Sequence, residues 1–349
     1  MDDLGRYARQ SVLAEIGVEG QKRLLASSAA VIGCGALGTH IASHLVRAGV
    51  GRVLLVDRDL VELSNLQRQI LFDEQDIARG LPKAVAAADK LRQINSQVQV
   101  EAVVTDVNPD NVENLIGDVS LVLDGTDNFE TRFLINDACV KLDIPWVYGA
   151  VVSTYGMTMT IIPHETPCFR CFLSEMPPPG SVPTCDTVGV LGTAAAIVAA
   201  LEATEALKLL TGHTEAIQRK LLYVDAWTGE LEHFALSKGD TPCPVCDLGH
   251  FEFLEAREGS WATSLCGRQA VQVNTRHNAG REKGHETHLS FPQLAQRLRS
   301  AGQVSFNDHL LRFRVDSFEL TVFPDGRAIV HGVTDPALAR ALYARYIGA

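Results

Sequence analysis

Two Cys-x-x-Cys pairs are the strongest chemical signal in the sequence, and they account for four of its eight cysteines. The first pair is Cys168 and Cys171, and the second, far along the chain, is Cys243 and Cys246. Two such pairs can place four thiolates in a tetrahedron with no open coordination position, as in structural zinc sites. A redox-active dithiol is the alternative reading, but the presence of a second pair favours Zn²⁺. We therefore expect zinc to join two distant segments of one domain.

A glycine signature lies near the start of the chain. Gly33, Gly35 and Gly38 form a Gly-x-Gly-x-x-Gly loop between a short apolar run and a segment with helical spacing. Glycines in this position allow a tight turn and let backbone N–H groups approach a phosphate at the start of a helix. Asp57 ends the next apolar run, where a carboxylate can accept hydrogen bonds from ribose hydroxyls. By itself this pattern predicts an adenine nucleotide, with NAD as the first choice, and a structural turn without a ligand is the alternative.

Polar side chains downstream of Asp57 favour a different nucleotide. Asn65, Arg68 and Lys83 follow in order, and Asp127 comes after the fourth expected strand. The nicotinamide end of NAD is not polyanionic and does not need these cations, whereas a triphosphate does when charge grows in an adenylyl-transfer transition state. A carboxylate such as Asp127 suits Mg²⁺, which takes few protein ligands. Each residue alone is compatible with a solvated surface, but the ordered set favours ATP and Mg²⁺.

Cys185 lies in a proline-containing stretch just before a long apolar helix. A thiol close to a helix amino terminus has a lowered pKa and is more nucleophilic. Such a thiol can carry a covalent intermediate, although an incidental cysteine is the alternative. Cys34, Cys139 and Cys266 are expected to be packing residues.

The order of the expected elements predicts the fold class. Strands alternate with helices, which indicates an α/β fold with a Rossmann-like, doubly wound, mostly parallel sheet covered by helices on both faces. The expected strands and helices of this half are, in order, 6–25 (helix), 29–32, 39–48 (helix), 52–56, 82–94 (helix), 98–103, 120–123, 128–142 (helix) and 146–148.

After residue 149 the pattern changes. A strand is expected at 153–162, followed by a crossover loop at about 173–188 whose prolines predict poor order. A long apolar helix over about 190–210 and two further strands at 221–225 and 231–236 complete this part.

The chain is long enough for two domains, and its charge is divided unevenly. Residues 1–246, with an N-terminal arm at 1–28, carry a net charge of −12, while residues 247–349 carry +1. The second part is expected to be a small α+β domain. Its only cysteine is Cys266, near its start, which argues against a rhodanese domain. His277, His285 and His288 lie in a Gly/Glu/Lys-rich stretch that we interpret as a solvated loop.

Composition excludes several classes of protein. The net charge of −11 argues against nucleic acid or an anionic membrane as a partner. The longest apolar run is too short to span a bilayer, and the polar N-terminus does not resemble a secretory signal. We therefore expect a cytoplasmic location.

Taken together, these motifs resemble those of the ThiF/MoeB/HesA adenylyltransferases, relatives of ubiquitin-activating enzymes. The resemblance covers about residues 5–246, and the tail is similar to the extension of longer ThiF-like members. The motifs that carry it are Arg6-Tyr7-Ala8-Arg9-Gln10, the Gly33–Gly38 loop, Ser64-Asn65-Leu66-Gln67-Arg68-Gln69, Leu81-Pro82-Lys83, Asp124-Gly125-Thr126-Asp127-Asn128, both cysteine pairs and Thr184-Cys185.

The resemblance implies a reaction and a set of partners. Mg·ATP would adenylate the Gly-Gly carboxylate of a ubiquitin-like sulfur carrier, either a ThiS-like carrier for thiamine or a MoaD-like carrier for molybdopterin. It also implies a homodimer and a sulfur donor such as a cysteine desulfurase. The implied roles are ribose binding by Asp57, phosphate binding by Asn65, Arg68 and Lys83, Mg²⁺ binding by Asp127 and reach into the partner subunit by Arg9. Cys185 aligns with the cysteine that forms a covalent link with the carrier in thiamine-pathway members, whereas molybdopterin-pathway members do not require it.

Other functions stay open from the sequence. A peptide-modifying adenylyltransferase shares the same core motifs. An NAD-dependent oxidoreductase fits the glycine loop alone but not the cations and the four-cysteine site, and a non-catalytic scaffold is disfavoured by the full set of nucleotide-site candidates.

Overall fold

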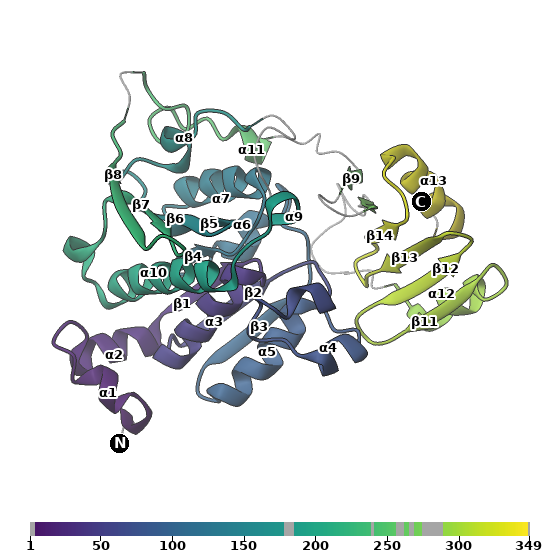
Figure 1. The fold of residues 1–349 in the computed structure, drawn as a ribbon, viewed down its shortest axis with the longest axis horizontal. Helices are drawn as coiled ribbons and strands as arrows, with labels where there is room; N and C mark the ends of the chain where they lie inside the picture. The colour runs from purple at the N-terminus through teal and green to yellow at the C-terminus, as the bar shows by residue number, and fades with distance from the viewer. Residues whose placement is uncertain are drawn as a thin grey trace. The chain divides into compact units, whose positions relative to one another are not determined.

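The computed structural model describes residues 4–177, 185–238, 241–255, 262–264, 269–273 and 289–347. The chain divides into two compact units, Met1–Arg257 and Glu258–Ala349 (Figure 1). The division lies after Arg257, whereas the sequence predicted it after Cys246. Phe251, Phe253 and Leu254 pack against the core of the first unit, so the segment after the second cysteine pair belongs to that unit.

The first unit is built on one eight-stranded sheet in the order β3-β2-β1-β4-β5-β6-β7-β8. The first five strands in this order are parallel, and β6, β7 and β8 are added antiparallel. Central strands of this kind are buried on both faces and therefore have continuous apolar sequences. The strands are β1 (Ser28–Ile32), β2 (Arg52–Val56), β3 (Gln99–Val103), β4 (Leu121–Asp124), β5 (Trp146–Val152), β6 (Tyr155–Ile161), β7 (Lys220–Asp225) and β8 (Glu230–Ala235).

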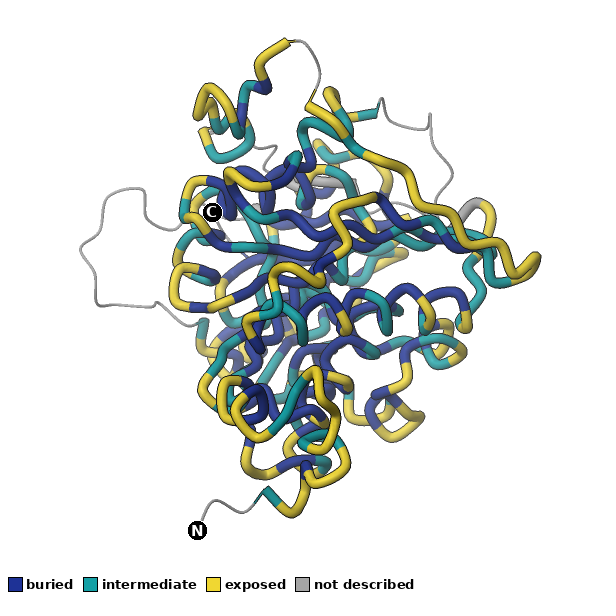
Figure 2. Tube along the Cα trace, turned by 90° about the vertical axis from the view of Figure 1, so that its left-hand side faces the viewer, coloured by how far each residue is buried: buried dark blue, intermediate teal, exposed yellow. Residues whose placement is uncertain are grey.

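Helices cover both faces of this sheet (Figure 1). On one face α3 (Ala36–Ala48), α5 (Lys83–Ile94) and α10 (Gly192–Thr211) form one hydrophobic core with the strands. On the other, α6 (Val112–Ile116), α7 (Phe129–Lys141) and α8 (Phe169–Phe172) form a second core. Figure 2 shows the buried residues concentrated along the strands and the inner sides of the helices. The predicted α/β class is confirmed.

The remaining elements of the first unit are short. They are η1 (Leu4–Tyr7), α1 (Ala8–Ser11), α2 (Gly17–Ala26), η2 (Leu63–Asn65), α4 (Glu74–Ala78), α9 (Cys185–Val188), η3 (Thr214–Ala216) and α11 (Glu252–Glu255). The helix α9 falls within the crossover segment predicted as a loop at about 173–188, and residues 178–184 of that segment lie outside the described residues. The helix predicted over 6–25 is divided into three pieces.

The second unit is an antiparallel sheet in the order β11-β12-β13-β14-β10-β9 with two helices, which confirms the predicted small α+β domain. Apolar side chains of α12 and α13 pack on one face of the sheet. Its elements are β9 (Ala262–Ser264), β10 (Ala270–Val273), α12 (Phe291–Leu298), β11 (Gln303–Phe306), β12 (Leu311–Val315), β13 (Phe318–Val322), β14 (Ala328–His331) and α13 (Pro336–Tyr346).

Four residues considered in the sequence, Cys266, His277, His285 and His288, lie outside the described part of the second unit. Among the helices of the described residues, none combines the length and the apolar character needed to cross a membrane.

Candidate nucleotide and metal sites

The glycine loop connects β1 to α3 and is packed tightly against the turn after β4. Gly33 has a positive φ of 93°, and a Cβ atom there would lie 2.5 Å from the carbonyl oxygen of Gly125. A Cβ on Gly38 would lie 1.8 Å from the carbonyl oxygen of Gly33, so neither position can hold a side chain. A Cβ on Gly35, by contrast, would meet only the Gly125 oxygen, at 3.7 Å. Gly35 precedes α3, and its open surroundings leave room for an anion at the positive end of that helix.

Asp57 is attached to this loop by hydrogen bonds. Its Oδ2 accepts from the backbone N–H of Cys34 at 2.6 Å, and its Oδ1 accepts from the backbone N–H of Asp59 at 2.7 Å. Burial raises the pKa of Asp57 above its ordinary value, although the nearby Lys83 ammonium opposes this effect. The side chain is therefore fixed at the end of β2 with oxygen lone pairs left to accept from ribose hydroxyls.

Lys83, the first residue of α5, is buried beside these carboxylates. Its Nζ lies 2.9 Å from Oδ2 of Asp59. Burial alone would lower the pKa of Lys83, but the carboxylates of Asp59 and Asp57, with a further contribution from Asp127, raise it above its ordinary value. Lys83 is consequently an ammonium at neutral pH, as a residue that neutralises phosphate charge must be.

Asp127 is exposed in the turn that follows β4. Its negative charge contributes to the raised pKa of Lys83, so the structure brings Asp127 into electrostatic range of the Lys83 ammonium. An exposed carboxylate near a phosphate-binding cation fits Mg²⁺, which keeps several water and phosphate ligands.

A buried ion pair that the sequence analysis did not single out anchors this turn. Nε of Arg132 lies 2.9 Å from Oδ2 of Asp124, and Nη2 of Arg132 donates to the carbonyl oxygens of Thr126 at 2.7 Å and Gly149 at 3.0 Å. The other oxygen of Asp124 accepts from both the N–H and the hydroxyl of Thr126. The sequence held one sign that Arg132 is buried: it lies in an expected helix and is followed by the apolar residues Phe133, Leu134 and Ile135.

Asn65 and Arg68 lie on the turn after β2 and make local contacts. Asn65 is buried, and its Oδ1 accepts from the backbone N–H of Glu62 at 3.1 Å, so it caps the η2 turn. Arg68 is half-buried, and its guanidinium donates to the carbonyl oxygen of Ser64 at 2.8 Å. The structure therefore gathers Asp57, Lys83 and Asp127, whereas the described contacts of Asn65 and Arg68 are within their own turn.

The four cysteines of the Cys-x-x-Cys pairs form one cluster. The Sγ atom of Cys168 lies 3.8 Å from that of Cys171 and 3.7 Å from that of Cys243, and the Sγ atoms of Cys171 and Cys246 are 3.5 Å apart. All four sulfur atoms lie within 4.8 Å of one another. Tetrahedral Zn–S bonds of about 2.3 Å require sulfur atoms about 3.8 Å apart, so the donor set and its spacing fit Zn²⁺. These sulfur atoms are too far apart for disulfide bonds.

Cys185 is half-buried at the start of α9, and its Sγ lies 3.5 Å from the carbonyl oxygen of Val151, near the end of β5. The thiol is thus placed at the carboxyl edge of the sheet, where open α/β sheets bind their ligands.

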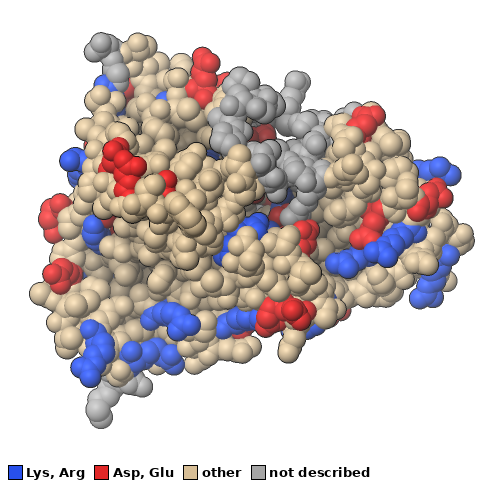
Figure 3. All heavy atoms as spheres, in the orientation of Figure 1, with Lys and Arg blue, Asp and Glu red and all other residues tan. Residues whose placement is uncertain are grey.

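Arg9 is exposed on the N-terminal arm, away from the glycine loop of its own chain. The arm is anchored where α3 and α5 end, since Arg6 donates to the carbonyl oxygen of Ile94 and Gln10 to that of Ala48. The helix α3 begins beside the glycine loop and runs to Ala48, a length of about 18 Å at 1.5 Å per residue. Lys and Arg side chains gather over this region, at the lower left of Figure 3.

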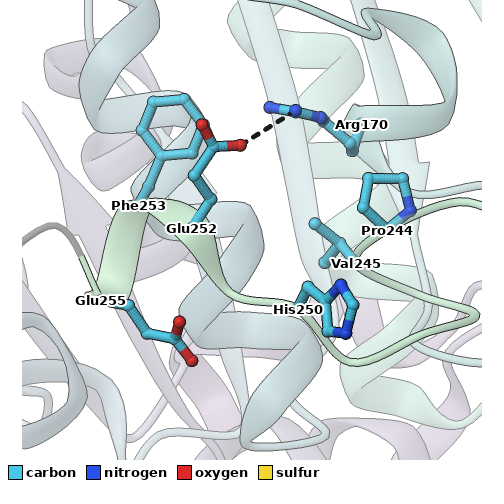
Figure 4. Close-up of a pocket in the computed structure, with 7 residues that line it drawn as sticks. All are labelled: Arg170, Pro244, Val245, His250, Glu252, Phe253 and Glu255. Carbon is cyan, nitrogen blue, oxygen red and sulfur yellow. Dashed lines mark hydrogen bonds and ion pairs between the residues drawn. The ribbon is translucent and has the colours of Figure 1, made fainter.

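A surface hollow of about 550 Å³ lies beside the cysteine cluster (Figure 4). Arg170 and Glu252 form an ion pair at 3.0 Å within it. The hollow is on the same side of the unit as the cysteine cluster, and its lining includes none of the nucleotide-site candidates. Its lining residues are Arg170, Pro244, Val245, His250, Glu252, Phe253 and Glu255.

Comparison with known proteins identifies the family of the chain. The model of the ThiF family matches residues 7–245. The sulfur carrier protein ThiS adenylyltransferase of Bacillus subtilis is 45% identical over 346 residues, which are 99% of each chain. The adenylyltransferase and sulfurtransferase MOCS3 of Culex quinquefasciatus is 37% identical over 70% of this chain and 56% of its own length. The solved structure of E. coli MccB with ATP has the same fold, with a TM-score of 0.59 at 21% identity over 69% of this chain and 74% of that one. The chain belongs to the ThiF family.

Proposed function

We propose that this ThiF-family adenylyltransferase uses Mg·ATP to adenylate the C-terminal carboxylate of a ubiquitin-like sulfur carrier of the ThiS type, for thiamine thiazole synthesis. The observation that carries the proposal is the similarity to the B. subtilis ThiS adenylyltransferase, which extends over 99% of both chains and so includes the second unit. The MOCS3 relative, in contrast, aligns over only 70% of this chain.

The reaction depends on orienting the carrier carboxylate and ATP and on neutralising the phosphate charge, and less on acid–base groups. One oxygen of the carrier carboxylate attacks the α-phosphorus of ATP, the bond from that phosphorus to the bridging oxygen of the β-phosphate breaks, and pyrophosphate leaves. Since the carboxylate is already ionised at neutral pH, no general base is required. The products are the acyl adenylate of the carrier and pyrophosphate.

Within this reaction the buried groups hold the nucleotide. Asp57 accepts hydrogen bonds from the ribose hydroxyls, and the N–H groups at the start of α3 donate to the phosphate oxygens. The Lys83 ammonium exchanges part of its contact with Asp59 for a phosphate oxygen and stabilises the developing negative charge. The guanidinium of Arg68 turns from the Ser64 carbonyl oxygen toward the polyphosphate, and Asn65 holds the turn that carries Arg68.

Asp127 would hold Mg²⁺, which supplies further charge neutralisation on the phosphates. Arg132 pairs with Asp124 and donates to the carbonyl oxygen of Thr126, and these contacts hold the turn that carries the Asp127 carboxylate.

Arg9 would act on the nucleotide of a second subunit in a homodimer. Its arm is fixed by Gln10 and Arg6 at the end of α3 opposite the glycine loop, so it cannot serve the site of its own chain without release of those contacts.

Docking of the carrier fits the free edge of the large sheet. All residues of β8 are exposed, and large apolar side chains project there, among them Trp227 in the preceding turn, Leu231 and Phe234. An exposed edge strand offers unpaired backbone groups to a partner strand. A ubiquitin-like carrier, which is rich in strands, suits this surface.

Cys185 would receive the activated carrier. Its thiolate would attack the acyl adenylate, form a thioester with the carrier and release AMP. The persulfide of a sulfur donor such as a cysteine desulfurase would then attack this thioester, release the Cys185 thiolate and leave an acyl disulfide between the carrier and the donor. The position of Cys185 beside Val151, at the edge of the sheet, supports this role.

The test is ATP–pyrophosphate exchange with two purified carriers, one of the ThiS type and one of the MoaD type. We expect exchange with the ThiS-type carrier and at least tenfold less with the other. The reverse preference would assign the protein to molybdopterin synthesis, for which the MOCS3 relative is the supporting observation.

A further inference from the structure

Glu202 is a fully buried acid in the middle of α10, and neither of its carboxyl oxygens has a hydrogen-bond partner in the described residues. The carboxyl group occupies the space that a side chain at Gly149 of β5 would otherwise fill. A Cβ on Gly149 would lie 1.9 Å from Oε1 of Glu202. A glycine is therefore required opposite this acid.

The hydroxyl of Thr158 is a second polar group on the face of the sheet where Glu202 meets Gly149. Thr158 on β6 pairs with Gly149 across the β5–β6 ladder, so its side chain points to the same face of the sheet. The Thr158 hydroxyl is buried and has no partner among the described residues. After a small rotation this hydroxyl could exchange a hydrogen bond with the Glu202 carboxyl group, as the acceptor when the acid is neutral and as the donor when it is ionised.

Gly149 also connects Glu202 to the nucleotide site. Its carbonyl oxygen accepts from Nη2 of Arg132 at 3.0 Å, and the same nitrogen donates to the carbonyl oxygen of Thr126 at 2.7 Å. Thr126 is the neighbour of Asp127. Contacts thus run without a break from Glu202 through Gly149 and Arg132 to the turn that carries Asp127.

The charges around Glu202 favour its neutral form. Burial raises the pKa of Glu202 well above its ordinary value, the Asp124 carboxylate on β4 raises it further, and the Arg132 guanidinium on α7 lowers it. The Tyr148 phenol on β5 is also within electrostatic range of Glu202. On α10 itself, Glu205 has its own partners, the Thr160 hydroxyl and the Gln218 N–H. An ionised Glu202 would compete with Asp124 for Arg132.

We propose that Glu202 is a positioning residue which, as a neutral acid against Gly149, leaves Arg132 free to hold Asp124 and the Asp127 turn. This inference rests on the proposed role of Asp127 in Mg·ATP binding. Glu202 touches no substrate and acts only through Gly149 and Arg132.

The first test does not depend on catalysis. Infrared spectroscopy of the full-length protein at pH 7.5 should show the carbonyl stretch of a buried protonated carboxylic acid, and this band should be absent from the Glu202→Gln variant. Glu202→Gln should also unfold at a higher temperature than the wild type at pH 8, with a smaller difference at pH 5. A carboxyl whose folded pKa lies above its unfolded pKa reduces stability as pH rises between the two values, and the amide does not titrate.

The second test measures the connection to the nucleotide site. Glu202→Gln should keep the KM for Mg·ATP within about twofold of the wild type, whereas Glu202→Asp, whose shorter side chain moves the carboxyl group away from Gly149, should raise that KM at least fivefold with a smaller effect on kcat. Glu215→Gln, which changes an exposed acid after α10, is the matched control and should leave KM unchanged.

Three results would overturn the proposal: no protonated-acid band, equal stability of Glu202→Gln and wild type at both pH values, or an unchanged KM in Glu202→Asp. A wild type that shows no exchange with either carrier would contradict the proposed function. The infrared and unfolding measurements would still test the protonation state of Glu202 in that case.

Discussion

The ammonium of Lys83 lies 2.9 Å from the carboxylate of Asp59, two residues after Asp57. This pair, in which the lysine is buried and the aspartate half-buried, keeps Lys83 charged and pointed at the end of β2, where the ribose and phosphates of a nucleotide would lie. The site thus holds the Lys83 ammonium in position through carboxylates of the turn after β2, which also carries Asp57, the proposed ribose ligand. A bound triphosphate would only have to replace the contact between Lys83 and Asp59, because the Lys83 ammonium is already oriented.

Replacement of Lys83 should remove most of the catalytic power. Lys83→Ala is expected to lower carrier-dependent ATP–pyrophosphate exchange by about 10²- to 10³-fold, because one preorganised stabiliser of developing charge is lost. Lys90→Ala changes another lysine on the same helix, one that pairs with Asp73 and Asp76, and should leave exchange within about twofold. Exchange in Lys83→Ala at the level of the control would contradict the assigned role.

Asp127→Asn should weaken the binding of Mg²⁺ without harming the fold. The side chain is exposed, so the midpoint of thermal unfolding should stay within about one degree of the wild type, in line with ordinary surface substitutions. The kcat/KM for exchange should fall at least 50-fold, and the Mg²⁺ concentration for half-maximal rate should rise. Glu130→Gln, at an exposed acid three residues away, is the control. An unaltered Mg²⁺ titration in Asp127→Asn would place the metal ligand elsewhere.

The four-cysteine cluster should contain one tightly held zinc ion per chain. Cys171→Ser is expected to lose this zinc, measured by atomic absorption, and to lower the unfolding temperature, because the metal joins the segment after β6 to the end of the first unit. Cys139→Ala alters a buried cysteine outside the cluster and should keep its zinc. Full zinc content in Cys171→Ser would show that the cluster is not the metal site.

Cys185→Ala should separate adenylation from any covalent step. The thiol is not required for attack on the α-phosphorus, so exchange should remain within about threefold of the wild type. The carrier–enzyme adduct, detected by intact mass, should disappear. Should exchange be lost together with the adduct, the crossover segment would instead help to assemble the adenylation site.

The sequence predicted the parts of this molecule that follow from local rules. The glycine loop, the apolar strands and Asp57 at the end of β2 are local patterns, and so are the two cysteine pairs, whose four sulfur atoms the fold brings together. Such patterns are visible because short spacing along the chain fixes them.

What the sequence did not reveal depends on contacts between distant segments. Arg132 and Glu202 are charged residues in helices, for which an exposed position is the ordinary expectation, and only the sheet between them explains their burial. The boundary of the first unit was placed too early because the packing of Phe253 on Phe133 has no local signal. Short helices such as α4 and α6 are stabilised by tertiary packing and were likewise missed.

The most direct test of the account is ATP–pyrophosphate exchange with a ThiS-type carrier that ends in Gly-Gly and with the same carrier lacking its last glycine. The account predicts rapid exchange with the intact carrier, at least 100-fold slower exchange with the shortened one, and a mass increase of the intact carrier that corresponds to its adenylate. Equal exchange with both carriers, or none with either, would contradict the claim that this protein activates the carboxylate of a Gly-Gly carrier.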